Sequence, residues 1–104
     1  MLEKRKPHYD LALVRRLVRE GSLAATPRVY AYFRARGWAI EYMPTCLEDL
    51  KQADFHKSQA HRERSGAWLD IYRPTVDGLR LYVKFTVDGG TVWVLSFCVD
   101  GDEH

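Results

Sequence analysis

The residues best suited to chemistry in this chain are cations, a tyrosine and histidines in its second half. They comprise His56, Lys57, His61, Arg62, Arg64, Arg73, Arg80, Tyr82 and Lys84. RNA cleavage at a 2′-hydroxyl needs a base for the hydroxyl proton, cations that stabilise the phosphorane, and an acid for the leaving 5′-oxygen. Lysine, arginine and tyrosine side chains can divide these roles without a metal. The competing interpretation is an ordinary polar surface, on which both histidines are simply exposed.

Other catalytic chemistries fit the sequence poorly. The four histidines form no H-E-x-x-H motif, and Cys46 and Cys98 form no C-x-x-C motif, so we predict neither a metal site nor a cofactor. Cys98 has no base nearby in the sequence and is expected to act as a small buried hydrophobic residue. The glycines at 78, 89 and 90 fit turns better than a phosphate-binding loop.

Helices are predicted in the first half of the chain. Apolar residues at three- and four-residue spacing predict an amphipathic helix over residues 9–20. A second helix is predicted over residues 26–36, with Pro27 in its first turn. Residues 38–43 are predicted to be a short extended piece, and residues 46–55 a third short helix.

Strands are predicted in the second half, over residues 67–75, 79–87 and 91–99, with turns containing glycine between them. Alternation assigns Leu79, Leu81, Val83, Phe85, Val87, Trp93, Leu95, Phe97 and Val99 to the core side, and Arg80, Tyr82, Lys84, Thr86, Ser96 and Cys98 to the other side. The predicted fold class is α+β, with N-terminal helices packed on one face of a C-terminal antiparallel sheet and the other face open to solvent or ligand.

Composition limits the class of protein. The chain has 104 residues, of which 46% are apolar and 29% charged, which predicts a single domain over residues 1–104. No apolar run approaches the roughly 20 residues of a membrane span, and the basic start leads into an amphipathic stretch, so neither a membrane protein nor a signal peptide is expected. Two cysteines are too few for a disulfide scaffold, which favours the cytoplasm.

The formal net charge of +2 conceals an uneven distribution. Residues 1–36 carry a net charge of +6 and residues 55–87 of +3, whereas residues 37–54 carry −3 and residues 88–104 carry −4. The basic segments are suited to contact with phosphate, although basic residues on a helix are commonly just a solvated face. The sequence assigns no role to the acidic stretches.

Five blocks resemble the toxin family of the motility quorum-sensing regulator, MqsR. They are EKRKPHYDLALVRRLV (3–18), ADFHKS (53–58), WLDIYRP (68–74), LYVKFTV (81–87) and VLSF (94–97). The resemblance implies a RelE-like α/β fold and an endoribonuclease that cleaves mRNA at GCU-type sites without requiring the ribosome. It also implies a cognate antitoxin with a zinc-binding N-terminal domain and a helix-turn-helix C-terminal domain, so the zinc belongs to the partner.

The resemblance also assigns residues. It places catalytic residues on Lys57 and Tyr82, whereas Leu69 and Cys98 replace a glutamine and a lysine of the family. We expect Lys57 to stabilise the phosphate and Tyr82 to act as general acid or base. Supporting candidates are Arg73, Arg80, Lys84, His56 and His61.

Three hypotheses follow from these features. The first is an active mRNA interferase held in check by its antitoxin. The second is a catalytically weakened or inactive toxin-like module that binds antitoxin and RNA, because Leu69 and Cys98 lie within the expected site. The third is a basic nucleic-acid-binding protein without an antitoxin.

Overall fold

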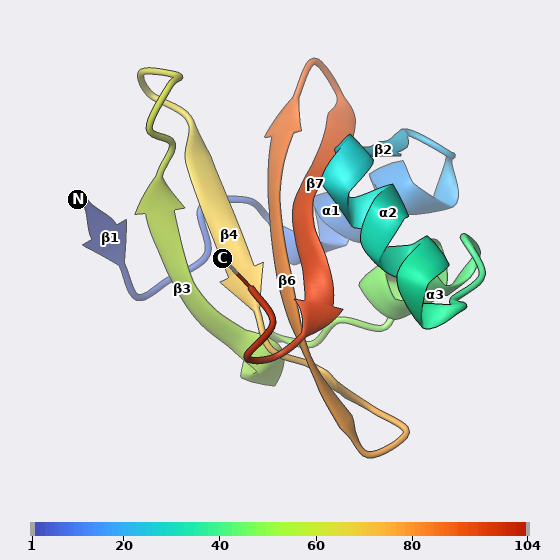
Figure 1. The fold of residues 1–104 in the computed structure, drawn as a ribbon. Coiled ribbons are helices and arrows are strands. Elements are labelled where there is room, and N and C mark those ends of the chain that lie inside the picture. Colours follow the sequence, from blue (N-terminus) through green and yellow to red (C-terminus); the bar gives the residue numbers. More distant parts are fainter. Residues whose placement is uncertain (1, 104) are drawn as a thin grey trace.

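The computed structural model describes residues 2–103, which form an α+β fold (Figure 1). Its elements in chain order are β1 (Glu3–Lys4), α1 (Leu11–Arg19), β2 (Leu23–Ala25), α2 (Pro27–Arg36), α3 (Tyr42–Glu48), the 3-10 turn η1 (Gln52–Asp54), β3 (Phe55–Ala60), β4 (Trp68–Tyr72), β5 (Thr75–Val76), β6 (Leu79–Asp88) and β7 (Thr91–Val99). The predicted fold class is therefore confirmed.

The strands form one mixed sheet in the order β1-β3-β4-β6-β7-β2, and β5 pairs separately with β6. Pairing is antiparallel except between β7 and β2, which run parallel because α1 and the turn after it carry the chain to the far edge of the sheet. The prediction of a purely antiparallel sheet is therefore wrong for the β7–β2 pair. The central pairings β4–β6 and β6–β7 are antiparallel, as expected.

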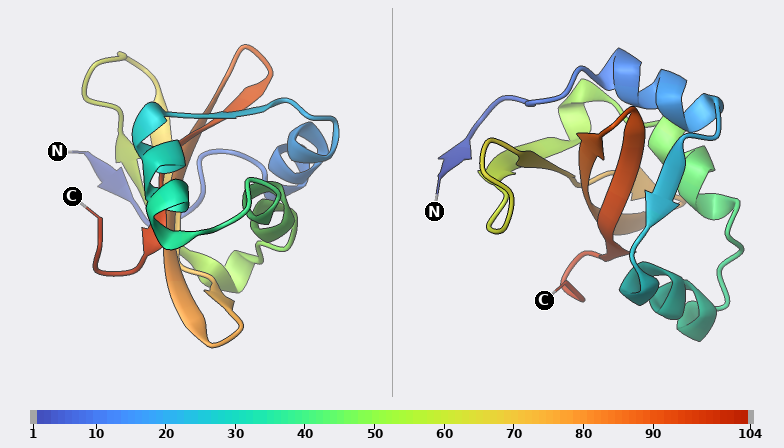
Figure 2. Two further views of the ribbon diagram at one scale, coloured as in Figure 1. Left: turned by 45° about the vertical axis from the view of Figure 1, so that its right-hand side comes forward. Right: turned by 90° about the horizontal axis from the view of Figure 1, so that it is seen from above.

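The helices gather around the β7–β2 side of the sheet, and the β1–β3 side extends away from them (Figure 2). The core lies between the helices and one sheet face, where Val14 of α1 and Phe33 of α2 meet Phe85 and Phe97. Phe33 and Phe97 pack edge to face with ring centroids 5.1 Å apart. Burial of these apolar side chains is the main force that holds the layers together.

The predicted helices α1 and α2 are confirmed, and their ends follow the expected chemistry. The Asp10 carboxylate accepts a hydrogen bond from the backbone N–H of Ala12, which satisfies one of the free N–H groups at the start of α1. Gly37 ends α2 in the left-handed region, with φ of 71°.

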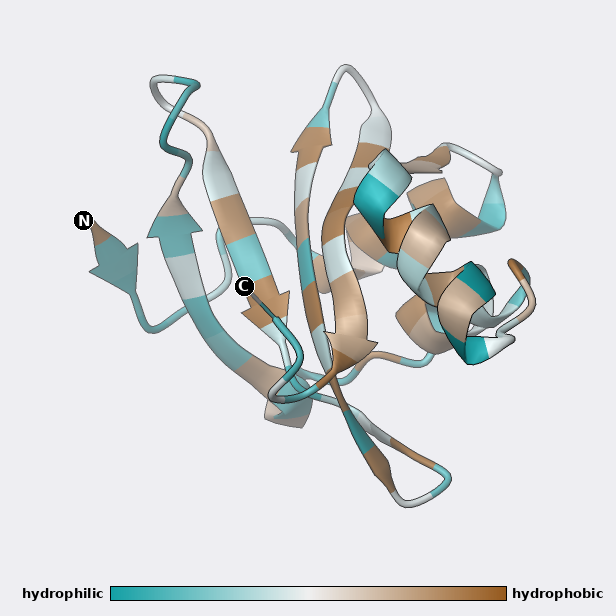
Figure 3. Cartoon of the chain, viewed as in Figure 1, coloured by the Kyte–Doolittle hydropathy of each residue, from teal (hydrophilic) through white to brown (hydrophobic). Residues whose placement is uncertain are grey.

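The predictions for residues 38–55 are wrong in part. Residues 38–43 are not extended, because α3 already begins at Tyr42. The helix expected over residues 46–55 ends at Glu48, and Phe55 begins β3. Strand β3 (FHKSQA) is short and hydrophilic, as its colouring in Figure 3 shows, so it lacks the apolar alternation that predicts a strand.

A bulge in β7 reverses the predicted side-chain faces over half of that strand. Lys84 pairs with Ser96 but the next residue of β6 pairs with Val94, so Leu95 is an extra residue. One extra residue shifts the alternation by one position. Trp93, predicted to lie in the core, is therefore 42% exposed, and Val94 is buried in its place.

The N-terminal segment is fastened to the sheet by a buried carboxylate. Asp70 of β4 accepts hydrogen bonds from the backbone N–H groups of His8 (3.0 and 3.1 Å) and Tyr9 (2.9 Å). Three contacts with backbone donors compensate the cost of burying the charge. This attachment fixes the start of the chain near β1 and β3, which carry part of the site described next.

Candidate active site

A row of side chains crosses four adjacent strands on the sheet face opposite the core. Lys57 of β3 lies opposite Ile71 of β4, Ile71 opposite Lys84 of β6, and Lys84 opposite Ser96 of β7. Residues directly opposite each other project from the same face, and strands lie about 4.8 Å apart, so the two lysine backbones are about 10 Å apart. Both ammonium groups can therefore reach one phosphate placed between them.

Tyr82 lies in the next row, directly opposite Cys98. It is 9% exposed and packs against Ile71, Cys98 and Tyr32 in a small second cluster on this face. Burial raises the pKa of the Tyr82 phenol, and the charge of Glu103 raises it further. The phenol is therefore protonated at neutral pH and can donate a proton.

Lys57 is held in place by Glu3 of the first strand. Its Nζ lies 2.8 Å from Glu3 Oε2, and Gln59 Nε2 donates to the same oxygen at 3.3 Å. The hydrogen bond from Lys57 is the main cause of the lowered pKa of Glu3, and Gln59 adds to it. Sequence reasoning missed both partners, because the two-residue strand that carries Glu3 has no pattern of its own.

His56 lies at the end of β3 where the register shifts between Phe55 and Lys57, and the backbone N–H of Arg73 donates to the carbonyl of Asp54 just before that strand. Burial lowers the pKa of His56, and the charges of Arg73 and Lys57 lower it further. The imidazole is therefore largely neutral at neutral pH and can accept a proton. Arg73 Nε lies 3.7 Å from Asp100 Oδ1.

On this face Cys98 is buried and Lys84 is half-buried. Burial is the largest cause of the lowered pKa of Lys84, followed by the charges of Arg28 and Arg62. Burial raises the pKa of the Cys98 thiol to about 11, so the thiol is protonated at neutral pH. A protonated thiol is a poor nucleophile.

Two of the candidate residues lie away from the row. Arg80 is exposed at the start of β6, where it pairs with Thr75 of β5. His61 follows the opposite end of β3 from His56, a separation of about 16 Å along an extended strand. Its Nδ1 accepts a hydrogen bond from the backbone N–H of Glu63, which places it in the loop before β4.

The position at which the resemblance implies a glutamine is apolar and shielded here. Leu69 is 7% exposed, and it lies opposite Gln59 of β3. An amide is therefore present on this face, one strand away from Leu69.

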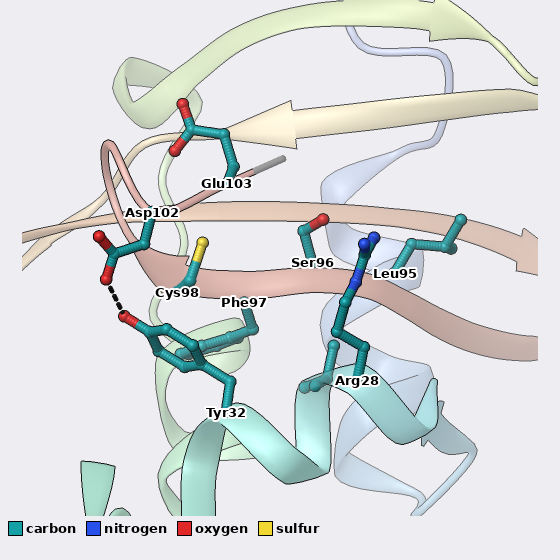
Figure 4. A pocket seen from close by; sticks show the side chains of 9 residues that line it. Arg28, Tyr32, Leu95, Ser96, Phe97, Cys98, Asp102 and Glu103 are labelled. Carbon is teal, nitrogen blue, oxygen red and sulfur yellow. Dashed lines mark hydrogen bonds between the residues drawn. The ribbon is translucent and has the colours of Figure 1, made fainter. Parts of the chain in front are cut away.

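A small cavity of about 80 Å³ adjoins the row, between α2 and β7. Its floor includes Ser96 and Cys98, and the C-terminal residues Asp102 and Glu103 lie at its rim. Figure 4 shows Ser96 and Cys98 projecting toward the side on which Glu103 lies, and Phe97 projecting the opposite way.

Metal and membrane features are absent from the described part of the chain. Residues 2–103 contain no group of three or more His, Cys, Asp or Glu side chains placed to hold a metal ion. Among the helices of residues 2–103, none is long and apolar enough to cross a membrane.

Comparison with known proteins agrees with the sequence blocks. The sequence profile of the family described as "Motility quorum-sensing regulator, toxin of MqsA" matches residues 6–98. The chain is also 31% identical, over 86 residues, to the mRNA interferase toxin MqsR of Escherichia coli (strain K12). That alignment covers 83% of this chain and 88% of the E. coli protein. Both matches extend over most of the chain, and the protein therefore belongs to the MqsR toxin family.

Proposed function

We propose that this protein is an mRNA endoribonuclease that cleaves RNA at GCU-type sites by metal-independent acid–base chemistry. The observation that carries the proposal is the row in which Lys57 and Lys84 flank Ile71, with the protonated Tyr82 in the adjacent row. Family membership and the name of the E. coli relative, an mRNA interferase toxin, support the same activity.

The chemistry divides among four side chains. The neutral His56 accepts the proton of the 2′-hydroxyl, and the 2′-oxygen attacks phosphorus. Lys57 and Lys84 stabilise the negative charge that develops on the phosphorane. Tyr82 gives its proton to the 5′-oxygen as the P–O5′ bond breaks, which leaves a 2′,3′-cyclic phosphate and a 5′-hydroxyl.

Three other side chains have supporting roles in this proposal. Arg73 lies beside His56 and contacts the RNA backbone on the 3′ or 5′ side of the cleaved bond. Arg80 and His61, which lie away from the row, contact flanking phosphates and have no part in proton transfer.

The proposed partner is a cognate antitoxin with a zinc-binding N-terminal domain and a helix-turn-helix C-terminal domain. The description of the matching family as a toxin of MqsA supports such a pairing. Purification of the chain together with the product of an adjacent gene of this type would test it, and failure of the two proteins to co-elute would argue against it.

Cleavage of a GCU-containing transcript in the presence of EDTA, with the 5′ ends of the products mapped, tests the proposed activity. We expect cleavage by the wild-type protein and a loss of about 10² to 10³ in rate for Lys57→Ala. Lys51→Ala is the matched control, because Lys51 is an exposed lysine that precedes η1 and lies outside the row. An intact transcript, or equal rates for the two variants, would contradict the proposal.

A second candidate function is a weakened or inactive toxin that binds antitoxin and RNA without cleaving it. The observation that favours it is that Leu69 and Cys98, where the resemblance implies a glutamine and a lysine, are shielded residues without a charge on the face that carries Tyr82. Binding of the transcript without cleavage, over hours and with EDTA absent as well as present, would support this second function.

A further inference from the structure

The chain ends in an acidic hook, formed by residues 100–103 (DGDE), that turns back from the end of β7. The Asp100 N–H donates to the Arg80 carbonyl at 2.9 Å, and the Asp102 N–H donates to the Val99 carbonyl at 2.9 Å. In Figure 1 the hook passes in front of β6. The hook lies beyond residues 6–98, to which the family profile extends.

A tyrosine of α2 fastens the hook. The Tyr32 hydroxyl donates a hydrogen bond to Asp102 Oδ2 at 2.7 Å, which Figure 4 shows as a dashed line. The same hydroxyl accepts a hydrogen bond from the backbone N–H of Val99 at 3.0 Å. Within the hook, the N–H of Gly101 donates to Glu103 Oε1 at 2.7 Å. The turn is therefore held from both sides, by α2 and by its own backbone.

The hook brings carboxylates to the open face that carries the candidate active site. Asp100 lies 3.7 Å from Arg73, and Glu103 shares a cavity with Ser96 and Cys98. These two cavity residues lie directly opposite Lys84 and Tyr82 in the sheet. Glu103 is also the charge that contributes most to the raised pKa of Tyr82.

We propose that the acidic hook is an intrachain competitor of the RNA backbone. Asp100 lies beside Arg73, and Glu103 lines the cavity that adjoins the row, at positions that phosphates of a bound RNA would take. RNA must therefore displace the hook before it reaches the row. This inference rests on the proposed function, since it presumes that the open face binds RNA. The hook thereby lowers the affinity of the isolated toxin for RNA.

The role of Tyr32 separates this mechanism from a general effect of charge. Tyr32→Phe removes the hydroxyl that holds Asp102 and leaves every charge of the protein in place. If the hook competes with RNA through its position, its release alone strengthens RNA binding. If only the net charge matters, Tyr32→Phe changes nothing.

The test measures the affinity of a fluorescent GCU-containing oligonucleotide by anisotropy at several salt concentrations. The oligonucleotide carries 2′-O-methyl groups, so it cannot be cleaved through its 2′-oxygen and binding is measured apart from catalysis. The hook-neutral variant is Asp100→Asn/Asp102→Asn/Glu103→Gln. Its matched control, Glu20→Gln/Glu41→Gln/Asp49→Asn, makes the same change in net charge at exposed residues on the helical side.

At about 50 mM salt we expect the hook-neutral variant to bind about tenfold more tightly than the wild type, and Tyr32→Phe about threefold more tightly. The control variant stays within about twofold of the wild type because its charges lie on the helical side, which covers the sheet face opposite the row. The difference between hook-neutral and wild-type protein shrinks as salt rises. A double variant, Asp100→Asn/Glu103→Gln, keeps the contact of Asp102 with Tyr32, so it tests the inference if the triple variant does not fold. Thermal unfolding shows which variants are folded.

Equal affinities of the hook-neutral and control variants, when both are folded, would overturn the inference. If the wild type cleaves a natural transcript while these affinities are equal, only the inference fails. If no variant binds the oligonucleotide and no transcript is cleaved, the inference and the proposed function fail together.

Discussion

Tyr82→Phe removes one oxygen atom from the centre of the open sheet face. The aromatic ring, which packs against Ile71 and Cys98, is retained, so the fold and the neighbouring strands keep their packing. The substitution also changes no charge, because burial raises the pKa of the phenol and keeps it protonated at neutral pH. Any loss of activity therefore reports on the proton that the hydroxyl carries.

The expected loss is large and is confined to the chemical step. A positioned general acid contributes about 10² to 10⁴ in rate, and the midpoint of about 10³ corresponds to about 4 kcal/mol of transition-state free energy. The affinity for uncleavable RNA changes by less than about threefold, because phosphate binding depends chiefly on the lysines and arginines. Because the pKa of Tyr82 is raised, the phenol stays protonated between pH 6 and 9. We therefore expect no decline in the wild-type rate from loss of this proton over that range.

Single-turnover cleavage of a 5′-labelled GCU-containing oligonucleotide, measured from pH 6 to pH 9, gives the rate of the chemical step and its dependence on pH. Tyr30→Phe is the matched control, because Tyr30 lies on α2 beside Val18 and Met43 at the helical side of the molecule. A Tyr82→Phe rate within about threefold of the wild type would refute the role of general acid, as would an equal loss in Tyr30→Phe.

Further predictions concern other parts of the molecule. Cys98→Lys, which introduces the cation that the resemblance implies at this position, should raise the cleavage rate at least about tenfold, whereas Cys98→Gln should not; equal rates would show that this cation does not limit activity. Because the pKa values of His56 and His8 are lowered in the folded protein, the unfolded chain takes up more protons below about pH 6.5, so the free energy of unfolding should fall as pH decreases below that value. Urea denaturation at pH 7.5 and 5.5 checks this, and His56→Gln should reduce the difference. Asp70→Ala should lower the free energy of unfolding by about 3 kcal/mol, because three hydrogen bonds to the backbone of residues 8 and 9 are lost. The exposed control is Asp49→Ala, and a change in Asp70→Ala no larger than in this control would contradict the prediction.

The parts of the fold that could be predicted from the sequence are those with a strong local pattern. Helix α1 has buried residues at the expected three- and four-residue spacing, and α2 begins at Pro27 and ends at Arg36, directly before Gly37. Strand β6 alternates without interruption through Val83 and Phe85. In each case local preference and burial in the core favour the same conformation.

The parts that could not be predicted depend on pairing between distant segments. Strand β3 is recognised as a strand only through its partners β1 and β4. The bulge at Leu95 leaves no mark in the sequence, since apolar residues occupy both faces of β7 around it. The two-residue strand β1 exists because Asp70 fastens the chain beyond it.

The same distinction applies to the candidate site. The resemblance predicted Lys57 and Tyr82, and alternation along β6 predicted that Lys84 shares the face of Tyr82. The contact of Lys57 with Glu3 joins residues 54 positions apart and has no local signal. The acidic residues at the C-terminus were visible in the charge distribution, but their position over the sheet follows only from the turn after Val99.

A lysine introduced at position 98 would be coupled electrostatically to the acidic hook, which predicts that the effects of Cys98→Lys and of neutralising the hook are not additive. A lysine at position 98 would lie in the cavity that Glu103 already lines, so the hook would neutralise part of the charge it adds. Cys98→Lys should therefore raise the cleavage rate more in the hook-neutral background than in the wild type. Rates of the four proteins of this double-mutant cycle give the coupling free energy, which is expected to be about 1 kcal/mol at low salt and to fall as salt increases. Additive effects at every salt concentration would mean that the hook does not reach position 98 in solution.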